Sequence, residues 1–284
     1  DVEEASGVIE HRPVIFTANA SHALKLVGES FPFDGDSRFV LTFDNHNSVN
    51  GIREFARRAG AETHYIPVTP PTLTISDASV SEALHRYATG GARLFAYPAQ
   101  SNFSGVKHSL TWIAEAQAAG YTVLLDAAAF APTNRLDLAA IHPDFVTLSF
   151  YKMFGYHNGI GALIAKRSAL TQLRRPWFAG GTIALASVQA DEFRFAIGPA
   201  AFEDGTPNFL AIPAVPFGLD ILETTGVEHI TARVRALTDW LLKELRPLAH
   251  GNGQPLVRLY GPWDAADRGG TLAFNLVGHR PAHG

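Results

Sequence analysis

The chain has 284 residues, and 46% of them are hydrophobic, which is enough to bury a large core in one sizeable domain or two unequal ones. The formal net charge is −4 and no basic run stands out, so a nucleic-acid partner is not expected. The absence of cysteine excludes disulfides and thiolate zinc sites, and no apolar stretch is long enough to predict a membrane span.

Short apolar strands alternate with helical patterns along the first half of the chain. Strands are predicted at residues 40–42, 62–68, 93–97 and 122–126, and a short strand or turn is predicted at 14–17. A further apolar run, 145–151, stands directly before Lys152. Helices are predicted at residues 20–29, 48–58 and 110–119, with another that begins at the capping-box pattern Ser79-Val80-Ser81-Glu82 and reaches about residue 89. The alternation predicts an α/β fold with a doubly wound, mainly parallel sheet.

The pattern changes after Pro213. A long amphipathic helix is predicted over 227–245, with one apolar face made by Ile230, Val234, Leu237, Leu241 and Leu245. A loop rich in glycine, proline and asparagine follows at 249–255, and then two strand-like runs, 256–260 and 271–277. We therefore expect a large domain over residues 1–213 and the start of a small α+β domain over residues 214–284.

Two charged residues stand at the ends of neighbouring apolar runs. Asp126 ends the run 122–126, and Lys152 follows the run 145–151, so a carboxylate and an amine are expected to emerge from adjacent parallel strands. Pyridoxal phosphate chemistry uses such a pair: the lysine forms a Schiff base with the cofactor, and the acid keeps the pyridine nitrogen protonated. Taken singly, each residue reads as an ordinary solvated strand-end charge.

The longer motif around this pair resembles a known family. The segment DAAAFAPTNRLDLAAIHPDFVTLSFYKMFGYHNGIGALIA, residues 126–165, is similar to the core of class V aminotransferases, which are fold type I pyridoxal phosphate enzymes. Within that group it resembles the N-terminal, desulfurase-like domain of molybdenum cofactor sulfurases. The same resemblance extends to FTANASHALKLVGESFPF (16–33), DNHNSVNGIRE (44–54), PAQSNFSG (98–105), WFAGGT (177–182) and FEDGTPNF (202–209).

The resemblance implies roles for three catalytic residues. Lys152 would be the Schiff-base lysine and would move protons to and from the substrate α-carbon, and Asp126 would pair with the pyridine nitrogen. His46, in a loop after a strand, would stack on the cofactor ring, although a lone loop histidine is more often a surface residue. The implied cofactor is pyridoxal 5′-phosphate, and the implied substrate is a small-molecule amino acid.

The predicted helix at 20–29 begins with a candidate phosphate site. A helix start offers the N–H groups that bind phosphate, so we expect the amides of Asn19 and Ala20 and the hydroxyl of Ser21 to bind it. A plain helix N-cap is the alternative. Because Asn19 replaces the glycine usual in the family, a left-handed backbone conformation is expected at this residue.

The resemblance implies further cofactor contacts. Ser149 and Tyr151 would add hydrogen bonds to the phosphate, and Asn102 would approach the phenolic oxygen of the cofactor or the substrate. Position 129, where cysteine desulfurases commonly carry glutamine or histidine, is Ala129. Thr206, in Gly205-Thr206-Pro207, would reach the phosphate of a neighbouring subunit, which implies a homodimer with composite active sites.

The reaction implied by the resemblance is cysteine desulfuration or C–S lysis. Another class V reaction, such as transamination, retro-aldol cleavage or decarboxylation, shares Lys152 and Asp126, and a cofactor-free scaffold is the non-enzymatic alternative. The resemblance places a persulfide cysteine and an arginine for the substrate carboxylate beyond Gly284, and it places a further segment before Asp1.

Two features bear on the cellular compartment. The acidic start of the chain lacks the basic and apolar regions of a signal peptide. Glycosylation triplets at Asn19 and Asn102 fall inside the expected cofactor site, where a glycan would block binding. Both observations indicate a cytoplasmic protein.

Overall fold

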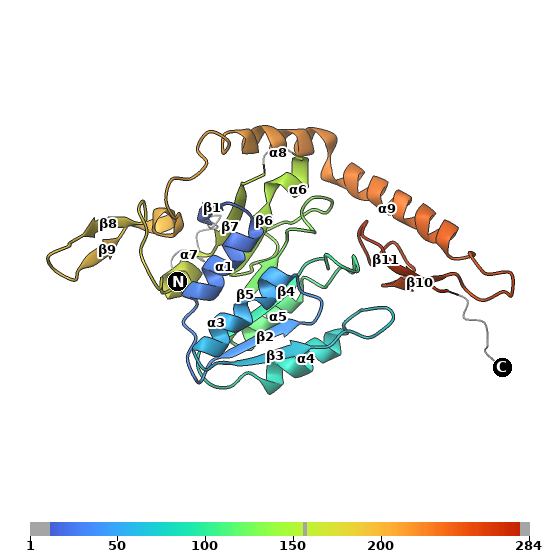
Figure 1. Cartoon of the computed structure of the whole chain (residues 1–284), viewed down its shortest axis with the longest axis horizontal. Coiled ribbons are helices and arrows are strands. Elements are labelled where there is room, and N and C mark those ends of the chain that lie inside the picture. Colours follow the sequence, from blue (N-terminus) through green and yellow to red (C-terminus); the bar gives the residue numbers. More distant parts are fainter. Residues whose placement is uncertain (1–11, 156–157, 279–284) are drawn as a thin grey trace.

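The computed structural model describes residues 12–155 and 158–278, so the acidic start of the chain lies outside the described residues. Within them, seven strands form one sheet in the order β1-β7-β6-β5-β4-β2-β3 (Figure 1). The strands are β1 (Val14–Thr17), β2 (Arg38–Thr42), β3 (Glu62–Ile66), β4 (Arg93–Pro98), β5 (Thr122–Asp126), β6 (Phe145–Ser149) and β7 (Gly161–Ala165). Neighbours pair in parallel except at β7, which is antiparallel to both β6 and β1. The predicted mainly parallel α/β sheet is therefore confirmed.

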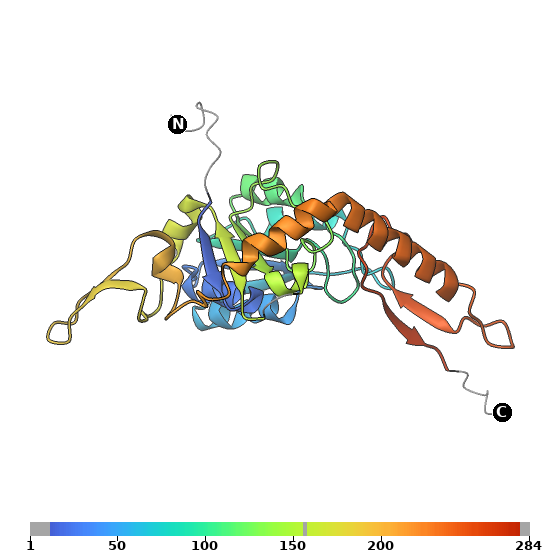
Figure 2. The same cartoon turned by 90° about the horizontal axis from the view of Figure 1, so that it is seen from above.

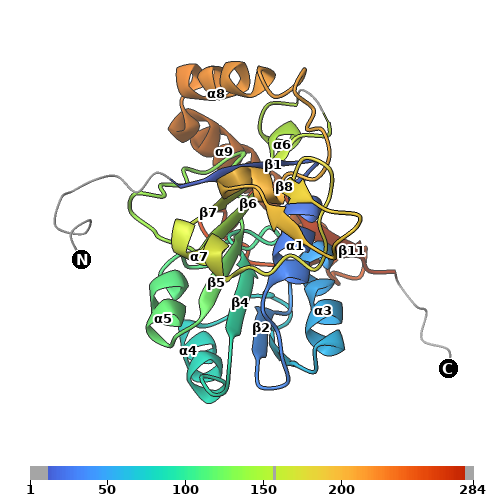
Figure 3. The same cartoon turned by 90° about the vertical axis from the view of Figure 1, so that its left-hand side faces the viewer.

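Helices cover both faces of this sheet, as expected of a doubly wound fold. Figure 3 shows α1 and α3 on one face and α4 and α5 on the other. The helices that accompany the sheet strands along the chain are α1 (Ala20–Ser30), α2 (Asn47–Asn50), α3 (Ile52–Arg58), α4 (Asp77–Arg86), α5 (Trp112–Ala118), α6 (Phe150–Phe154) and α7 (Arg167–Gln172).

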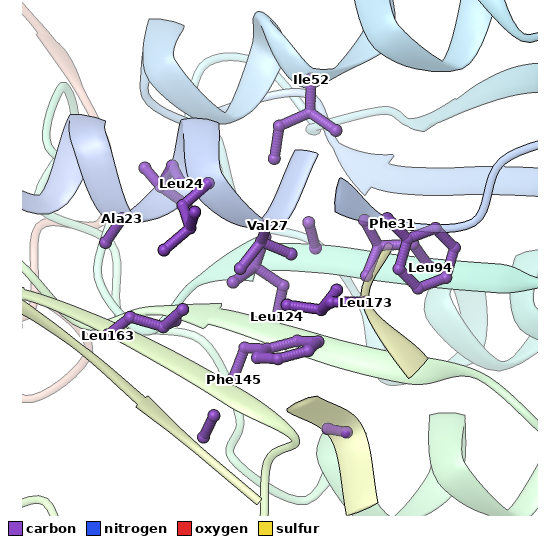
Figure 4. Close-up of a cluster of buried hydrophobic side chains, with 14 of the residues drawn as sticks. Ala23, Leu24, Val27, Phe31, Ile52, Leu94, Leu124, Phe145, Leu163 and Leu173 are labelled. Carbon is purple, nitrogen blue, oxygen red and sulfur yellow. The ribbon is translucent and has the colours of Figure 1, made fainter. Parts of the chain in front are cut away.

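The strands divide the core into two apolar clusters because successive side chains point to opposite faces. Leu94 and Leu124 pack with α1 on one face, whereas Phe95 and Val123 pack with α4 and α5 on the other. Figure 4 shows the first cluster, in which the apolar side of α1 lies over β4, β5, β6 and β7. A sheet buried on both faces explains why its central strands are continuous apolar runs.

Several element boundaries differ from the prediction, and three of the differences bear on the site or have a local cause. The helix predicted at 48–58 is divided at Gly51 into α2 and α3. Helix α4 starts earlier than the capping-box pattern indicated, because the hydroxyl of Ser76 caps it by accepting a hydrogen bond from the Ser79 amide at 3.1 Å. The apolar run that precedes Lys152 leaves the sheet at Ser149 and continues as α6, so Lys152 lies on a short helix.

The chain beyond the sheet extends to both sides of it (Figure 2). A hairpin of β8 (Ile183–Ala186) and β9 (Phe193–Phe195) lies at one side, and a short 3₁₀ helix follows at Gly198–Phe202. Helix α8 (Ala214–Thr225) packs beside α6, and α9 (Val227–Leu245) leads from it to the other side, where the antiparallel pair β10 (Val257–Tyr260) and β11 (Ala273–Leu276) lies. The predicted helix and both predicted strands are thus present, while the division into two domains at residue 213 stays a prediction.

The packing of α9 differs from the expected apolar face. Thr238 and Leu242 are its buried residues, and Leu237, which was assigned to the core face, is 46% exposed. Leu242 packs with Leu259 of β10 and with Ala265, so the hairpin selects a stripe displaced from the predicted one. In the part of the chain that the structure describes, no helix is both long and apolar enough to cross a membrane.

The segment between β10 and β11 is attached to the loop that follows β4. The amide of Lys107 donates to the carbonyl of Asp267 at 3.0 Å, and the amide of Gly269 donates to the carbonyl of Gly105 at 2.8 Å. The buried guanidinium of Arg268 donates to the carbonyl of Ser104 at 2.6 Å. The C-terminal segment therefore forms part of the support for residues 100–107.

Candidate active site

A pocket lies where β4, β5 and β6 end, at the carboxyl edge of the parallel strands, which is the usual ligand site of such sheets. It is lined by nine of the ten predicted cofactor residues, namely Asn19, Ala20, Ser21, His46, Asn102, Asp126, Ser149, Tyr151 and Lys152. The fold thus brings together residues separated by more than a hundred positions. The remaining predicted residue, Thr206, lies elsewhere.

Asp126 is the buried charged group of this pocket, with only 7% of its surface exposed. Its Oδ1 accepts hydrogen bonds from the Ala128 amide at 3.0 Å and from the Thr147 hydroxyl at 3.3 Å. Burial raises the pKa of this carboxyl, against the lowering effects of the Ala128 amide and of the nearby charge of Lys152. The site therefore favours either a neutral carboxyl or a cationic partner beside it.

Lys152 faces the same pocket from α6. This helix ends at Gly155, whose φ of 72° is a left-handed conformation that glycine adopts without strain. Among the described residues, Lys152 and Asp126 form no direct ion pair, although the lysine charge acts on the carboxyl pKa. Both groups thus remain available to a ligand placed between them.

His46 is held in place by its own helix. Its Nδ1 accepts a hydrogen bond from the Ser48 amide at 3.2 Å and so caps the N-terminus of α2. That bond orients the ring at the mouth of the pocket and leaves Nε2 as the nitrogen that can face a ligand. A flat, oriented ring at this position is suited to stacking.

The start of α1 is shaped differently from the expected phosphate loop. Asn19 is the N-cap residue, and its side chain accepts a hydrogen bond from the His22 amide at 3.0 Å. Its backbone is extended, with φ −177°, so the predicted left-handed conformation is wrong. An extended N-cap is compatible with any side chain, which explains why asparagine can replace glycine here.

The pocket wall between α1 and β6 is closely packed. The amide of Ala20 donates to the hydroxyl of Ser149 at 2.9 Å. A Cβ atom at Gly161 would lie 2.5 Å from the Cα of Asn19, so glycine is required for the start of α1 to approach β7. At the pocket edge, the hydroxyls of Ser21 and Ser48 are 2.6 Å apart. Hydroxyl and amide groups therefore converge at this end of the pocket.

Thr206 is exposed and borders a second pocket with Thr17, His22 and Pro207. Its loop is firmly held, because the Gly205 amide donates to the Gly180 carbonyl at 2.8 Å and Arg175 pairs with Asp204 at 2.5 Å. Within one chain, Thr206 does not reach the pocket of Lys152. A role in the site of a neighbouring subunit stays a prediction.

Sequence reasoning missed Gln100, which lines the pocket two residues before Asn102. The available signal was its position two residues after the end of β4, at the same sheet edge as Asp126. Leu24, Pro98, Ala128 and Ala129 complete the lining. Within residues 12–155 and 158–278, no group of three histidine or acidic side chains could hold a metal ion.

Known proteins resemble this chain over nearly its whole length. The aminotransferase class-V family model matches residues 1–283. Molybdenum cofactor sulfurase of Bos taurus is 37% identical over 290 residues, covering 94% of this chain and 32% of that protein. The Drosophila mojavensis protein of the same name is 38% identical, covering 93% and 38%. The chain thus spans about a third of the length of these relatives.

Solved structures share the fold. The apo structure of a cysteine desulfurase from Thermococcus onnurineus NA1 superposes with a TM-score of 0.81 at 25% identity, covering 95% of this chain and 64% of that one. A cysteine desulfurase from Escherichia coli gives a TM-score of 0.77 at 21% identity, covering 94% and 64%. A C-DES structure with glycine covalently linked to its PLP cofactor gives 0.73 at 18%, covering 93% and 67%. These likenesses are of fold, and the family model, which matches nearly the whole chain, shows that the chain belongs to the class-V aminotransferase family.

Proposed function

We propose that this chain binds pyridoxal 5′-phosphate and acts as a pyridoxal phosphate-dependent enzyme on an amino acid, with cysteine as the substrate and its C–S bond as the bond broken. The observation that carries the proposal is the shared pocket of Asp126 and Lys152. Membership of the class-V family supports the cofactor, and similarity to molybdenum cofactor sulfurases supports the choice of substrate.

The pocket fits this cofactor. Only Oδ1 of Asp126 has hydrogen-bond partners among the described residues, which leaves Oδ2 for a ligand donor. A cationic N–H beside this carboxylate would offset the burial that raises its pKa. A protonated pyridine nitrogen supplies such a group.

When bound, pyridoxal phosphate supplies an electron sink for the breaking bond of the substrate. Asp126 would hold the proton on the ring nitrogen. The amine of Lys152 would bind the aldehyde carbon and would carry protons to and from the substrate α-carbon. The oriented ring of His46 would limit tilting of the cofactor.

The hydroxyl of Ser149 suits a phosphate ligand. Its oxygen already accepts the Ala20 amide, but its own hydrogen remains free to be donated. Ser21 and the start of α1 would supply further donors near the positive end of the helix dipole. Tyr151, which also lines the pocket, would add its phenolic hydroxyl.

A second copy of the chain would complete the site. Thr206 is exposed on a firmly held loop and does not reach the pocket of its own chain. We include in the proposal a homodimer in which Thr206 donates to the phosphate of the partner subunit.

The decisive experiment is chemical labelling of Lys152. Protein reconstituted with pyridoxal phosphate should absorb in the visible region, and borohydride reduction followed by peptide mass analysis should locate a pyridoxyl group on Lys152. Lys166 gives a matched control, because its amine pairs with Asp144 at 3.0 Å outside the pocket. Labelling should disappear in Lys152→Ala and persist in Lys166→Ala. Labelling of another lysine, or no labelling at all, would overturn the proposal.

A further inference from the structure

The side chain of Gln100 is buried in the pocket wall but has an unused donor. It follows β4, is only 4% exposed and lines the pocket with Asp126 and Lys152. Its Oε1 accepts a hydrogen bond from Nδ2 of Asn134 at 3.4 Å. Its Nε2 has no hydrogen-bond partner in the described part of the chain. This nitrogen is not sealed off from solvent, so it opens on the pocket and can donate to a ligand there.

The C-terminal segment packs against the Gln100 amide. A Cβ atom at Gly269 would lie 2.3 Å from Oε1, 2.4 Å from Nε2 and 2.5 Å from Cδ of Gln100, so the backbone of Gly269 packs directly on the amide. Arg268, the preceding residue, donates to the carbonyl of Ser104. The amide can therefore not turn away from the pocket towards this segment.

The order of the strands determines which part of the cofactor Gln100 would meet. This step rests on the proposed function, in which Asp126 at the end of β5 takes the ring nitrogen. The proposed phosphate donor Ser149 ends β6, on one side of Asp126, whereas Gln100 follows β4 on the other side. In pyridoxal phosphate, the phosphate arm and the ring hydroxyl flank the aldehyde carbon on opposite sides. The ring oxygen would thus lie on the β4 side.

We propose that Nε2 of Gln100 donates a hydrogen bond to the ring oxygen of pyridoxal phosphate and so stabilises its anionic form. Ala129, on the loop after β5, offers no side-chain donor for this oxygen. Asn102 is exposed and borders both this pocket and the neighbouring hollow lined by Phe43, Tyr65 and Phe103. Asn102 accordingly faces the incoming substrate, while Gln100 binds the cofactor.

Substitution of Gln100 tests the assignment in the whole chain. Gln100→Leu keeps the approximate size and removes the donor, so the dissociation constant for pyridoxal phosphate should rise roughly tenfold. Gln100→Glu should weaken binding more strongly, because it places a negative charge against the anionic oxygen. The pH midpoint of the visible absorption band should move upward in Gln100→Leu, which a merely structural defect would not produce. Gln172→Leu, on the exposed end of α7, is the matched control.

A variant of Gly269 tests the packing of the C-terminal segment against the Gln100 amide. Gly269→Ala should displace the Gln100 amide and raise the dissociation constant, whereas Gly251→Ala, with no atom within 4 Å of its Cβ, should not. Thermal unfolding of each apoprotein establishes that it is folded; if Gln100→Leu does not fold, the nearly isosteric Gln100→Glu decides. An unchanged dissociation constant and pH midpoint in a folded Gln100 variant would overturn this inference and leave the labelling of Lys152 intact. Absence of labelling in the wild type would overturn the proposed function, and this inference with it.

Discussion

The hydroxyl of Ser149, the last residue of β6, accepts a hydrogen bond of 2.9 Å from the amide of Ala20, the first residue of α1. This bond joins the start of a helix to the strand that leads into Lys152. The donors at the start of α1 and the lysine amine are thereby kept at a fixed separation. A cofactor with a phosphate at one end and an aldehyde near the other needs such a fixed separation.

Replacing Ser149 with alanine removes the acceptor and leaves the buried Ala20 amide unpaired. We expect Ser149→Ala to lower the free energy of unfolding by about 1–3 kcal/mol and to weaken pyridoxal phosphate binding. Ser30, at the other end of α1, is the matched control, because its buried hydroxyl has no partner among the described residues. Ser30→Ala should be neutral or stabilising. Urea unfolding of both apoproteins measures the difference, and equal losses would contradict this explanation.

Asp126 should reduce the stability of the apoprotein at neutral pH. Its folded pKa is raised by burial, so the folded state holds a proton more tightly than the unfolded state does. The free energy of unfolding therefore falls as the pH rises from the pKa of Asp126 in the unfolded state to its pKa in the folded state. Above the folded-state pKa, the whole cost of burying the charged carboxylate is present. Asp126→Asn keeps an acceptor for Ala128 and Thr147 without the charge. Its apoprotein should melt higher at pH 7 and vary less with pH, while cofactor-dependent turnover falls by orders of magnitude.

Calorimetry of the apoproteins across pH 3–8 would measure both the melting temperature at pH 7 and its dependence on pH. Asp144→Asn provides the comparison, because Asp144 pairs with Lys166 and lies outside the pocket. A lower melting temperature for the Asp126→Asn apoprotein at pH 7 would contradict the role of burial.

Mixed dimers test the proposed position of Thr206. Combining Lys152→Ala subunits with Thr206→Ala subunits gives heterodimers with one site that carries both defects and one that carries neither. Cofactor affinity and borohydride labelling should then return to wild-type values at one site per heterodimer. Thr225→Ala, on α8, serves as the control. A chain that is monomeric by sedimentation at full cofactor occupancy would rule out the composite site.

Product analysis separates two ways of breaking the C–S bond. Desulfuration converts cysteine into alanine and sulfide and consumes two electrons, which a thiol must supply. C–S lysis instead converts cysteine and water into pyruvate, ammonia and sulfide without a reductant. Because this chain has no cysteine, we expect alanine only when a thiol such as dithiothreitol is added. Pyruvate formed without thiol would favour lysis, and neither product would point to another class V reaction.

The sequence was most informative where the signal is local. Helix α9 has the predicted bounds because its amphipathic pattern starts directly after Gly226. The strand that ends at Asp126 and the strand that leads into α6 and Lys152 were predictable because a sheet covered on both faces needs apolar runs. The reversed direction of β7 has no comparable signal, because β7 is buried like its parallel neighbours and is an apolar run as they are.

Long-range contacts account for most of what could not be predicted. Gln100 belongs to the pocket partly because Gly269, far along the chain, packs on its amide. The buried stripe of α9 is selected by β10, which a periodic pattern alone does not specify. The glycine usual at position 19 in the family predicts a left-handed backbone, whereas the extended N-cap formed by Asn19 serves the same helix start.

The attachment of Arg268 and Gly269 to the loop after β4 couples the C-terminal hairpin to the pocket. A ligand that needs the Gln100 amide in its packed position binds only when residues 267–269 are attached to the loop after β4. Ligand binding and this attachment must therefore stabilise each other by the same free energy. The amides of Lys107 and Gly269 should therefore exchange their hydrogens more slowly once the pocket is filled. Amides of the distant β8–β9 hairpin should not. The hairpin would then report occupancy of a pocket that it does not line.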